Sequence, residues 1–409
     1  HVSEQGHIVL GTIIDGVKVF NQNNNLIASY NTSNGLQNNT VLGIETDNFN
    51  NTWLALESGI DFISGDSTQG LKVNNIPGIG SIYDAAIFEN RIYLGTNRGL
   101  FFKPLENKTN NYTLVEKAQG QVWHCSIVDE TLVVGNNEGI LGIKNGETYQ
   151  ISSQPGGFSI RPDPFHPENL YIESSYSNLV TIEKSNGVFR QRGTIKGFFD
   201  LIRFIEFDHK GNLWASHMRR GIYKLELNAA RDSVMKAKYY GKNSVFGKDH
   251  SIHVFKIENR VVFTTENILC TYDDLNDSII PYSRLNRQLG EYASAHRIIE
   301  GINNHYWFIT DEKIGLFSIL NNQAQLLKTI PRTLFTSNEL IDGFESIYPT
   351  GSMQGIICVE NGIASIDATQ ANNNPDIVQF LPKIREIILT DNQGKKGKVF
   401  FEENVLQVK

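Results

Sequence analysis

A short pattern that recurs about every 43 residues constrains the fold of this chain more than any other feature. Each copy has an apolar run, a small or polar residue, a polar turn that usually contains Gly, and a second apolar run. Five clear copies lie at 8–20, 52–63, 92–102, 132–143 and 213–225, and four weaker ones at 170–182, 261–272, 306–319 and 356–366. The period is that of one four-stranded propeller blade, so we predict an all-β chain built as a β-propeller.

The residues within each copy favour hairpins over helices. The strand-like segment 204–208 leads into a polar turn at 208–212, and Gly221 then permits a second tight turn. The composition agrees, because 35 Gly, 23 Phe and 15 Tyr stand against only 3 Met. Such a balance is typical of strands joined by tight turns.

Nine copies are more than the roughly four to eight blades of a usual ring, so the copies have to be divided. We predict two blades of a preceding ring at residues 1–78 and a seven-bladed propeller at residues 79–378. Residues 379–409, which follow a Gln/Asn-rich linker, are expected to begin an immunoglobulin-like β-sandwich. A single eight-membered ring with irregular ends is the alternative.

Charge and cysteine content argue against several classes of function. The net charge is −7 and no basic block occurs, so we expect no nucleic-acid binding. Cys125, Cys270 and Cys358 form no CxxC pair and are interpreted as small buried hydrophobes rather than metal or redox ligands. No segment approaches the about 18 apolar residues of a membrane span, and the start lacks Met and a secretion signal. We therefore expect a piece of a longer protein.

Two copies carry a more specific signature. Residues 31–63 read NTSNGLQNNTVLGIETDNFNNTWLALESGIDFI, and residues 204–225 read FIEFDHKGNLWASHMRRGIYKL. Both resemble the repeat of the two-component-regulator propeller family, in which an Asp-x-x-Gly-Asn turn precedes a Leu-Trp pair and a Gly-Leu or Gly-Ile close. In the second copy Asp208, Gly211 and Trp214 occupy the positions of that template.

The resemblance implies a function. Members of the family are extracytoplasmic sensors of Bacteroidetes, in which propellers precede a three-Y sandwich, a membrane helix, and a histidine kinase or helix-turn-helix output. By this resemblance the chain is the ligand-sensing region of a signal-transduction receptor on the periplasmic side of the inner membrane. An oligosaccharide is the implied ligand and a homodimer is a plausible state. The membrane segment and the transcription-regulating output would lie outside this chain.

One residue near the middle of each copy is taken as the anchor that aligns the copies, and in the predicted ring the anchors are Gly95, Gly135, Glu173, Ser216, Thr264, Ile309 and Cys358. The position about twelve residues before each anchor should start the innermost strand and face the central channel. These positions hold Tyr83, Trp123, Arg161, Arg203, His253, Arg297 and Ser346. Aromatic rings stack on pyranose faces and guanidinium groups hold oxyanions bidentately, so we predict the first six as binding residues for an oligosaccharide that carries an acidic group. Alternatively, some of them pack inside blades and pair with acids such as Asp84, Asp200 or Glu345.

No catalytic residue, metal ligand or cofactor motif is predicted. His250 and His253 would lie on opposite faces of one strand, and no GxSxG, HExxH or phosphate-binding glycine loop occurs. Asp61 and Asp311 are interpreted as solvated residues at blade edges. The chain is therefore predicted not to be an enzyme. A propeller-fold polysaccharide lyase or hydrolase that uses the same funnel is the alternative, and a protein-binding scaffold is a third reading.

Overall fold

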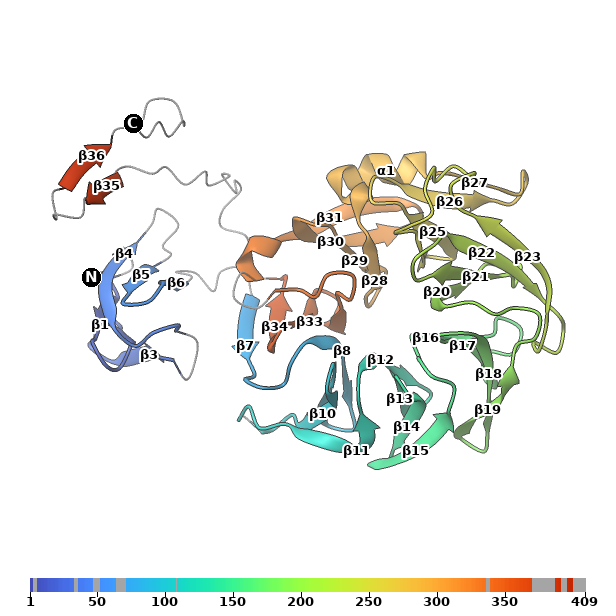
Figure 1. The fold of residues 1–409 in the computed structure, drawn as a ribbon, viewed down its shortest axis with the longest axis horizontal. Helices are drawn as coiled ribbons and strands as arrows, with labels where there is room; N and C mark the ends of the chain where they lie inside the picture. Colours follow the sequence, from blue (N-terminus) through green and yellow to red (C-terminus); the bar gives the residue numbers. More distant parts are fainter. Residues whose placement is uncertain are drawn as a thin grey trace. The chain divides into compact units, whose positions relative to one another are not determined.

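The computed structural model describes residues 1–2, 6–32, 36–46, 52–63, 71–107, 109–335 and 339–369, and two strands at 387–390 and 396–399. Seven four-stranded antiparallel sheets follow one another around a ring (Figure 1). The predicted β-propeller is thereby confirmed. Each sheet is one blade, and short turns connect strands that are neighbours in both sequence and space.

The first three blades keep the chain order from the innermost to the outermost strand. They are β8 (Ile82–Phe88), β9 (Arg91–Thr96), β10 (Gly99–Pro104) and β11 (Thr113–Gln119); β12 (Val122–Val128), β13 (Thr131–Asn136), β14 (Gly139–Lys144) and β15 (Glu147–Ser152); and β16 (Ser159–Pro162), β17 (Leu170–Ser174), β18 (Leu179–Ser185) and β19 (Val188–Thr194).

Blades 4 to 6 repeat this order, and blade 7 takes its outermost strand from elsewhere in the chain. They are β20 (Ile202–Phe207), β21 (Leu213–His217), β22 (Ile222–Leu227) and β23 (Val234–Tyr240); β24 (His253–Ile257), β25 (Arg260–Thr264), β26 (Leu269–Asp273) and β27 (Ser278–Pro281); β28 (Arg297–Glu300), β29 (His305–Ile309), β30 (Lys313–Leu320) and β31 (Gln323–Pro331); and β32 (Ile347–Gly351), β33 (Gln354–Val359) and β34 (Gly362–Asp367).

The ring is closed by β7 (Leu71–Asn75), which pairs antiparallel with β34 and completes blade 7. This strand precedes the ring in sequence, so residues 71–75 do not belong with the preceding blades to which the boundary at residue 78 assigned them. The physical reason is that an unpaired outer edge of the last blade would leave its backbone groups exposed for pairing with another chain. The repeat pattern marks inner strands and therefore does not reveal which segment supplies this closing strand.

Residues 8–63 form two three-stranded sheets. These are β1 (Ile8–Gly11), β2 (Val17–Phe20) and β3 (Leu26–Tyr30), and β4 (Val41–Thr46), β5 (Thr52–Leu56) and β6 (Ile60–Ile63). A small shared core of Val9, Val17 and Leu54 joins the two sheets. Their assignment to a preceding ring stays a prediction.

In the C-terminal unit, β35 (Ile387–Thr390) pairs with β36 (Lys396–Val399). The expected sandwich otherwise lies outside the described residues, so its identity also stays a prediction.

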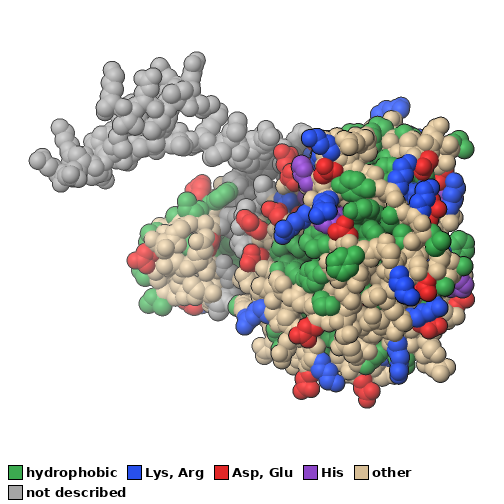
Figure 2. Space-filling view, turned by 45° about the vertical axis from the view of Figure 1, so that its right-hand side comes forward, with side chains coloured by type: hydrophobic (Ala, Val, Ile, Leu, Met, Phe, Trp, Pro, Cys, Tyr) green, Lys and Arg blue, Asp and Glu red, His purple; other side chains and the backbone are tan. Residues whose placement is uncertain are grey.

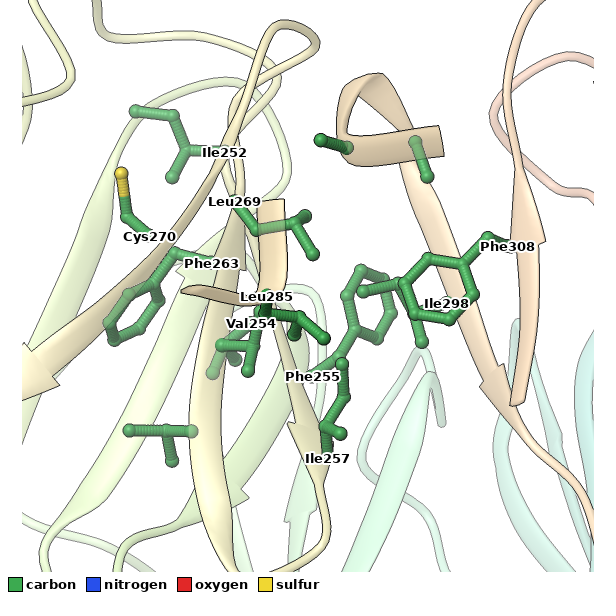
Figure 3. Packing of buried hydrophobic residues seen from close by; sticks show 14 of the residues in the cluster. Ile252, Val254, Phe255, Ile257, Phe263, Leu269, Cys270, Leu285, Ile298 and Phe308 are labelled. Atoms are coloured by element: carbon green, nitrogen blue, oxygen red, sulfur yellow. The ribbon is translucent and has the colours of Figure 1, made fainter. Parts of the chain in front are cut away.

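Blades 4 to 6 share the largest apolar cluster of the described residues, in which Phe255, Phe263 and Phe308 pack with aliphatic side chains (Figure 3). The connection between blades 5 and 6 contains α1 (Ser283–Leu289) and the 3-10 helix η2 (Gly290–Ser294), and Leu285 points into the cluster. A second 3-10 helix, η3 (Arg332–Phe335), follows blade 6. Among the helices that the structure describes, none is long and apolar enough to cross a membrane.

The three cysteines are buried and unbridged. Burial raises the pKa of the Cys270 thiol to about 11 and that of the Cys125 thiol well above its usual value. Thiols in such surroundings are poor nucleophiles, in keeping with a packing role.

Candidate ligand-binding site

Three of the predicted residues are the extra residues of β-bulges at the start of innermost strands. The pairing of β8 with β9 shifts at Tyr83, that of β12 with β13 at Trp123, and that of β20 with β21 at Arg203. A bulge interrupts the alternation of side chains between the two faces of a strand and re-aims one of them. These three side chains consequently reach a common pocket at one end of the channel.

Aromatic rings from blades 1 to 3 line one side of this pocket. The ring centroids of Tyr83 and Trp123 are 5.1 Å apart, and Phe158 lies 5.7 Å from Trp123. Phe344, from the connection that leads into blade 7, stacks on Trp123 at 5.2 Å and an interplanar angle of 28°. Phe158 and Phe344 had not been predicted as site residues.

Arg161 lies apart from the pocket. Its guanidinium binds Glu206 of blade 4, with Nη2 and Nε at 2.7 and 2.8 Å from Oε1. The long turn between β16 and β17 moves the start of blade 3 toward the N-terminus, so Phe158 lines the pocket in place of Arg161. Packing between blades therefore occupies this Arg, with a partner other than the acids suggested from the sequence.

Guanidinium groups and phenyl rings alternate on the other side of the pocket. The Arg203 Cζ atom lies 4.1 Å from the ring centroid of Phe344 and 4.7 Å from that of Phe204. The Arg297 Cζ atom lies 4.5 Å from the Phe204 ring and 5.5 Å from the Phe255 ring. The result is a continuous cation–π stack that runs from the loop before blade 7 to blade 5.

The two guanidinium groups in this stack are poorly neutralised. Burial lowers the pKa of Arg203 to about 9 and that of Arg297 to about 10. Asp84 and Glu345 are the acids whose charge acts on Arg297, but their ion pairs are with His124, His296 and Arg332. The Nε atom of Arg297 is buried and has no hydrogen-bond partner among the described residues.

Asp84 connects three blades below the aromatic wall. Its carboxylate accepts hydrogen bonds from the Ser346 hydroxyl at 2.7 Å and from the Cys125 backbone N–H at 2.8 Å. His124 Nδ1 lies 3.2 Å from the same carboxylate. Ser346, the register position of blade 7, thus fixes an acid and does not itself line the pocket.

The central pocket is small, and a larger cleft lies beside it. The pocket measures about 30 Å³, which is room for roughly one water molecule. The cleft measures about 630 Å³ and belongs to blades 5 and 6 and the connection to blade 7. Its lining residues are Ser251, His253, Glu266, His296, Asp311, Arg332, Phe335, Glu339, Leu340, Asp342, Gly343 and Glu345. Figure 2 shows hydrophobic side chains near the middle of the visible face of the ring and many charged ones toward its rim.

Four predicted residues therefore meet at the pocket, and His253 lines the cleft instead. Burial, with the charges of Arg203 and Arg297, holds the pKa of His253 well below its usual value. This imidazole is consequently neutral at physiological pH. Its Nδ1 atom is buried without a hydrogen-bond partner in the described part of the chain.

The cleft is rich in carboxylates. His296 joins two of them, with Nε2 at 2.8 Å from Glu345 and Nδ1 at 3.4 Å from Asp311. Arg332 binds Asp342 at 2.7 Å. Carboxylates accept hydrogen bonds from hydroxyl groups, so such a wall suits a polyhydroxylated ligand. Over the described ranges, no group of three or more His, Cys, Asp or Glu is arranged to hold a metal ion.

Comparisons with known proteins confirm the fold. No protein-family model and no curated protein matches the sequence. The extracellular domain of BT3049 from B. thetaiotaomicron, described as a hybrid two-component system, superposes with a TM-score of 0.61 at 14% identity, over 98% of this chain and 56% of that one. The extracellular domain of BT4673 from the same organism, described as a one-component system, gives 0.53 at 14% identity, over 92% and 53%.

The chain thus spans about half the length of these domains. They are of the kind to which the sequence resemblance pointed. An inactive virginiamycin B lyase variant from Staphylococcus aureus, with quinupristin, gives a TM-score of 0.50 at 13% identity, over 73% of this chain and 98% of that one. The same architecture is therefore found in both sensor domains and an enzyme.

Proposed function

We propose that this chain is the ligand-sensing region of an extracytoplasmic receptor and that it binds an oligosaccharide at the end of the ring that holds the pocket and the cleft. The observation that carries the proposal is the convergence of Tyr83, Trp123, Arg203 and Arg297, from four different blades, beside a cleft of about 630 Å³. That volume is within the usual range for ligand sites. The fold shared with extracellular domains of two-component and one-component systems supports a sensor over an enzyme.

The remaining parts of the proposal concern the whole receptor. The sensing region would lie on the periplasmic side of the inner membrane and relay binding to an output that follows a membrane segment. A change between two protomers is a simple way to carry the signal across, because a symmetric pair converts one binding event into a relative movement. The hairpin β35–β36 would begin the three-Y sandwich between propeller and membrane.

A glycan panel tests the proposal. Purified chain is heated with oligosaccharides of neutral, uronic and sulfated types while its unfolding is followed, and each mixture is then analysed for products. We expect at least one glycan to raise the unfolding midpoint with no product formed. Trp123→Ala should abolish that shift, and Trp53→Ala, a change in the N-terminal sheets, should leave it intact.

Two outcomes would contradict the sensor. Cleavage products that disappear in a His296→Ala variant would indicate a lyase or hydrolase, because His296 stands between two carboxylates in the cleft. If no glycan of the three types raises the unfolding midpoint, the result would favour the hypothesis of a scaffold whose partner is another protein.

A further inference from the structure

We propose that Phe344 occupies the place of the ligand, and that a sugar ring bearing an oxyanion, either carboxylate or sulfate, displaces it to bind between Trp123 and the pair Arg203 and Arg297. This inference rests on the proposed function and names the chemical class of the ligand.

The contacts of Phe344 are those that a bound pyranose would make. One face of its ring stacks on Trp123 at 5.2 Å with an interplanar angle of 28°, and Tyr83 adds a tilted contact at 5.3 Å. The Arg203 guanidinium covers the ring at 4.1 Å. The apolar C–H face of a pyranose chair stacks on aromatic rings, so a sugar of about the size of the Phe344 ring would fit between the indole and the guanidinium in its place.

The charges beneath this ring call for an anion. Buried cations are normally paired with a carboxylate, because removing a lone charge from water is costly. Here Arg203 donates a hydrogen bond to the backbone carbonyl oxygen of Gly343, and Arg297 keeps a buried Nε–H with no partner among the described residues. A carboxylate or sulfate between the two groups would supply the missing charge-assisted hydrogen bonds. A neutral sugar would not.

The space for a ligand already exists on the other side of the loop. Phe344 lines the central pocket, whereas the adjacent Gly343 lines the cleft of about 630 Å³. Gly343 has φ +76°, a backbone conformation that glycine adopts freely and can leave without a side-chain clash. Moving the Phe344 ring toward the cleft would join the two hollows into a single site that is open to a sugar.

The decisive variant is Phe344→Ala, studied in the full chain by titration calorimetry. The probes are glucuronic acid, galactose 6-sulfate, glucose, galactose and inorganic sulfate. We expect the variant to bind glucuronic acid or galactose 6-sulfate at least about tenfold more tightly than the unaltered chain, because no ring has to be displaced. The two neutral sugars should gain no comparable affinity. The acid sugar that gains more identifies the oxyanion.

Three further variants locate the effect. Phe165→Ala removes a Phe from the turn at the opposite end of blade 3 and should leave all affinities unchanged. Arg297→Gln in the Phe344→Ala background should cancel the gain for the acidic sugars, with circular dichroism confirming that the double variant is folded. Arg297→Lys in that background keeps the charge but not the fork, so it should retain only part of the gain.

The proposal is overturned if folded Phe344→Ala binds neither acidic sugar more tightly than the unaltered chain, or if the gain survives Arg297→Gln. It would also be overturned if Phe344→Ala gained as much affinity for inorganic sulfate as for the acidic sugars. That result would describe a simple anion site with no selectivity for a sugar. If a neutral oligosaccharide raises the unfolding midpoint of the unaltered chain, the sensor function is supported but this inference is wrong. Failure of the sensor alone would appear as product formation in the glycan panel.

Discussion

Blades 3 and 4 are neighbours in the ring but differ in the residue at one core position and in how their buried polar groups are paired. One position on the second strand of every blade points into the core and is fully buried, at 0% exposure. Its occupants are Leu94, Val134, Glu173, Ala215, Phe263, Phe308 and Ile357. Blade 4 therefore has an ordinary apolar residue at this position, and blade 3 has a carboxyl group.

The polar groups of the repeat signature in blade 4 are paired with one another. Trp214 is fully buried and its Nε1–H donates to Asp208 Oδ2 at 3.0 Å. The other oxygen of Asp208 accepts from the backbone N–H groups of Lys210 and Asn212, both at 2.9 Å. Both oxygens of Glu173 in blade 3, by contrast, are buried without a partner among the described residues. The comparison teaches that the buried polar groups of the Asp-x-x-Gly-Asn turn and its Trp pair with one another, whereas a buried acid outside that signature has no such partner in the described part of the chain.

The largest expected effect is that of Trp214→Ala in blade 4. The indole packs against Phe263 and Tyr272 of blade 5, each at 4.9 Å between ring centroids. Its loss also removes one of the two hydrogen bonds that Asp208 Oδ2 accepts and leaves only the one from the Asn212 side-chain amide. We expect the free energy of unfolding to fall by about 4–5 kcal/mol, measured by urea denaturation. A loss below about 1 kcal/mol would show that this signature residue does not hold the blade.

A slightly smaller loss in the free energy of unfolding is expected from Arg231→Met, which breaks a buried ion pair between blades 3 and 4. The Arg231 Nε atom lies 2.6 Å from Asp163 Oδ2, and the two side chains are 7% and 0% exposed. Methionine leaves the Asp163 charge buried without its cation, so the free energy of unfolding measured by urea denaturation should fall by about 3 kcal/mol. Asp163→Asn combined with Arg231→Met should recover part of this loss, and no recovery would mean that the charges are not coupled.

The same contrast shows what the sequence could reveal. Strong repeat copies predicted the ring and placed Tyr83, Trp123 and Arg203 at the channel, because in these blades the extra residue of the bulge lies at nearly the same distance before the anchor. Arg161 was misplaced, since a long turn shifted the register of blade 3. Phe344 lies in a connection outside the repeat, so periodicity carries no information about it.

Glu173 shows a different limit. The pattern of this weak copy aligned Glu173 with the anchors of the other copies, such as Gly95 and Ser216, one residue away from its true counterparts at the buried core position. A charged residue at a core position can be recognised in a sequence only when the alignment of the repeat copies is correct to within a single residue. Blade 3 is therefore the region in which the repeat pattern predicts least about either structure or stability.

A gain in stability is expected from Glu173→Gln. Burial raises the pKa of the Glu173 carboxyl well above its usual value, so the folded protein holds a proton that the unfolded chain releases above about pH 4.3. Folding therefore loses stability as pH rises from that value toward the folded pKa. Glutamine cannot ionise, so the variant should be more stable by about 1–3 kcal/mol at pH 8 and no more stable at pH 4.

The control for that experiment lies on the surface of blade 4. Glu226 pairs with Lys236 at 3.3 Å, and its side chain is 45% exposed. Glu226→Gln should change the free energy of unfolding by no more than about 0.5 kcal/mol at either pH. Equal gains for Glu173→Gln at pH 4 and pH 8 would mean that proton uptake by the buried acid is not the cause.

The smallest expected effect concerns the way blade 3 is tied to blade 2. The Tyr171 hydroxyl donates to Asp129 Oδ2 at 2.7 Å, and this bond, followed by that of Lys184, lowers the pKa of Asp129. Since the folded pKa is depressed, the stabilisation is present above the unfolded value of about 3.9 and is lost as pH falls through the folded value. Asp129 is 46% exposed, so Tyr171→Phe should cost only about 0.5–1 kcal/mol at pH 7. Urea denaturation at pH 7 and pH 3 measures this, and a cost that persists undiminished at pH 3 would show that the charge of the Asp129 carboxylate is not its cause.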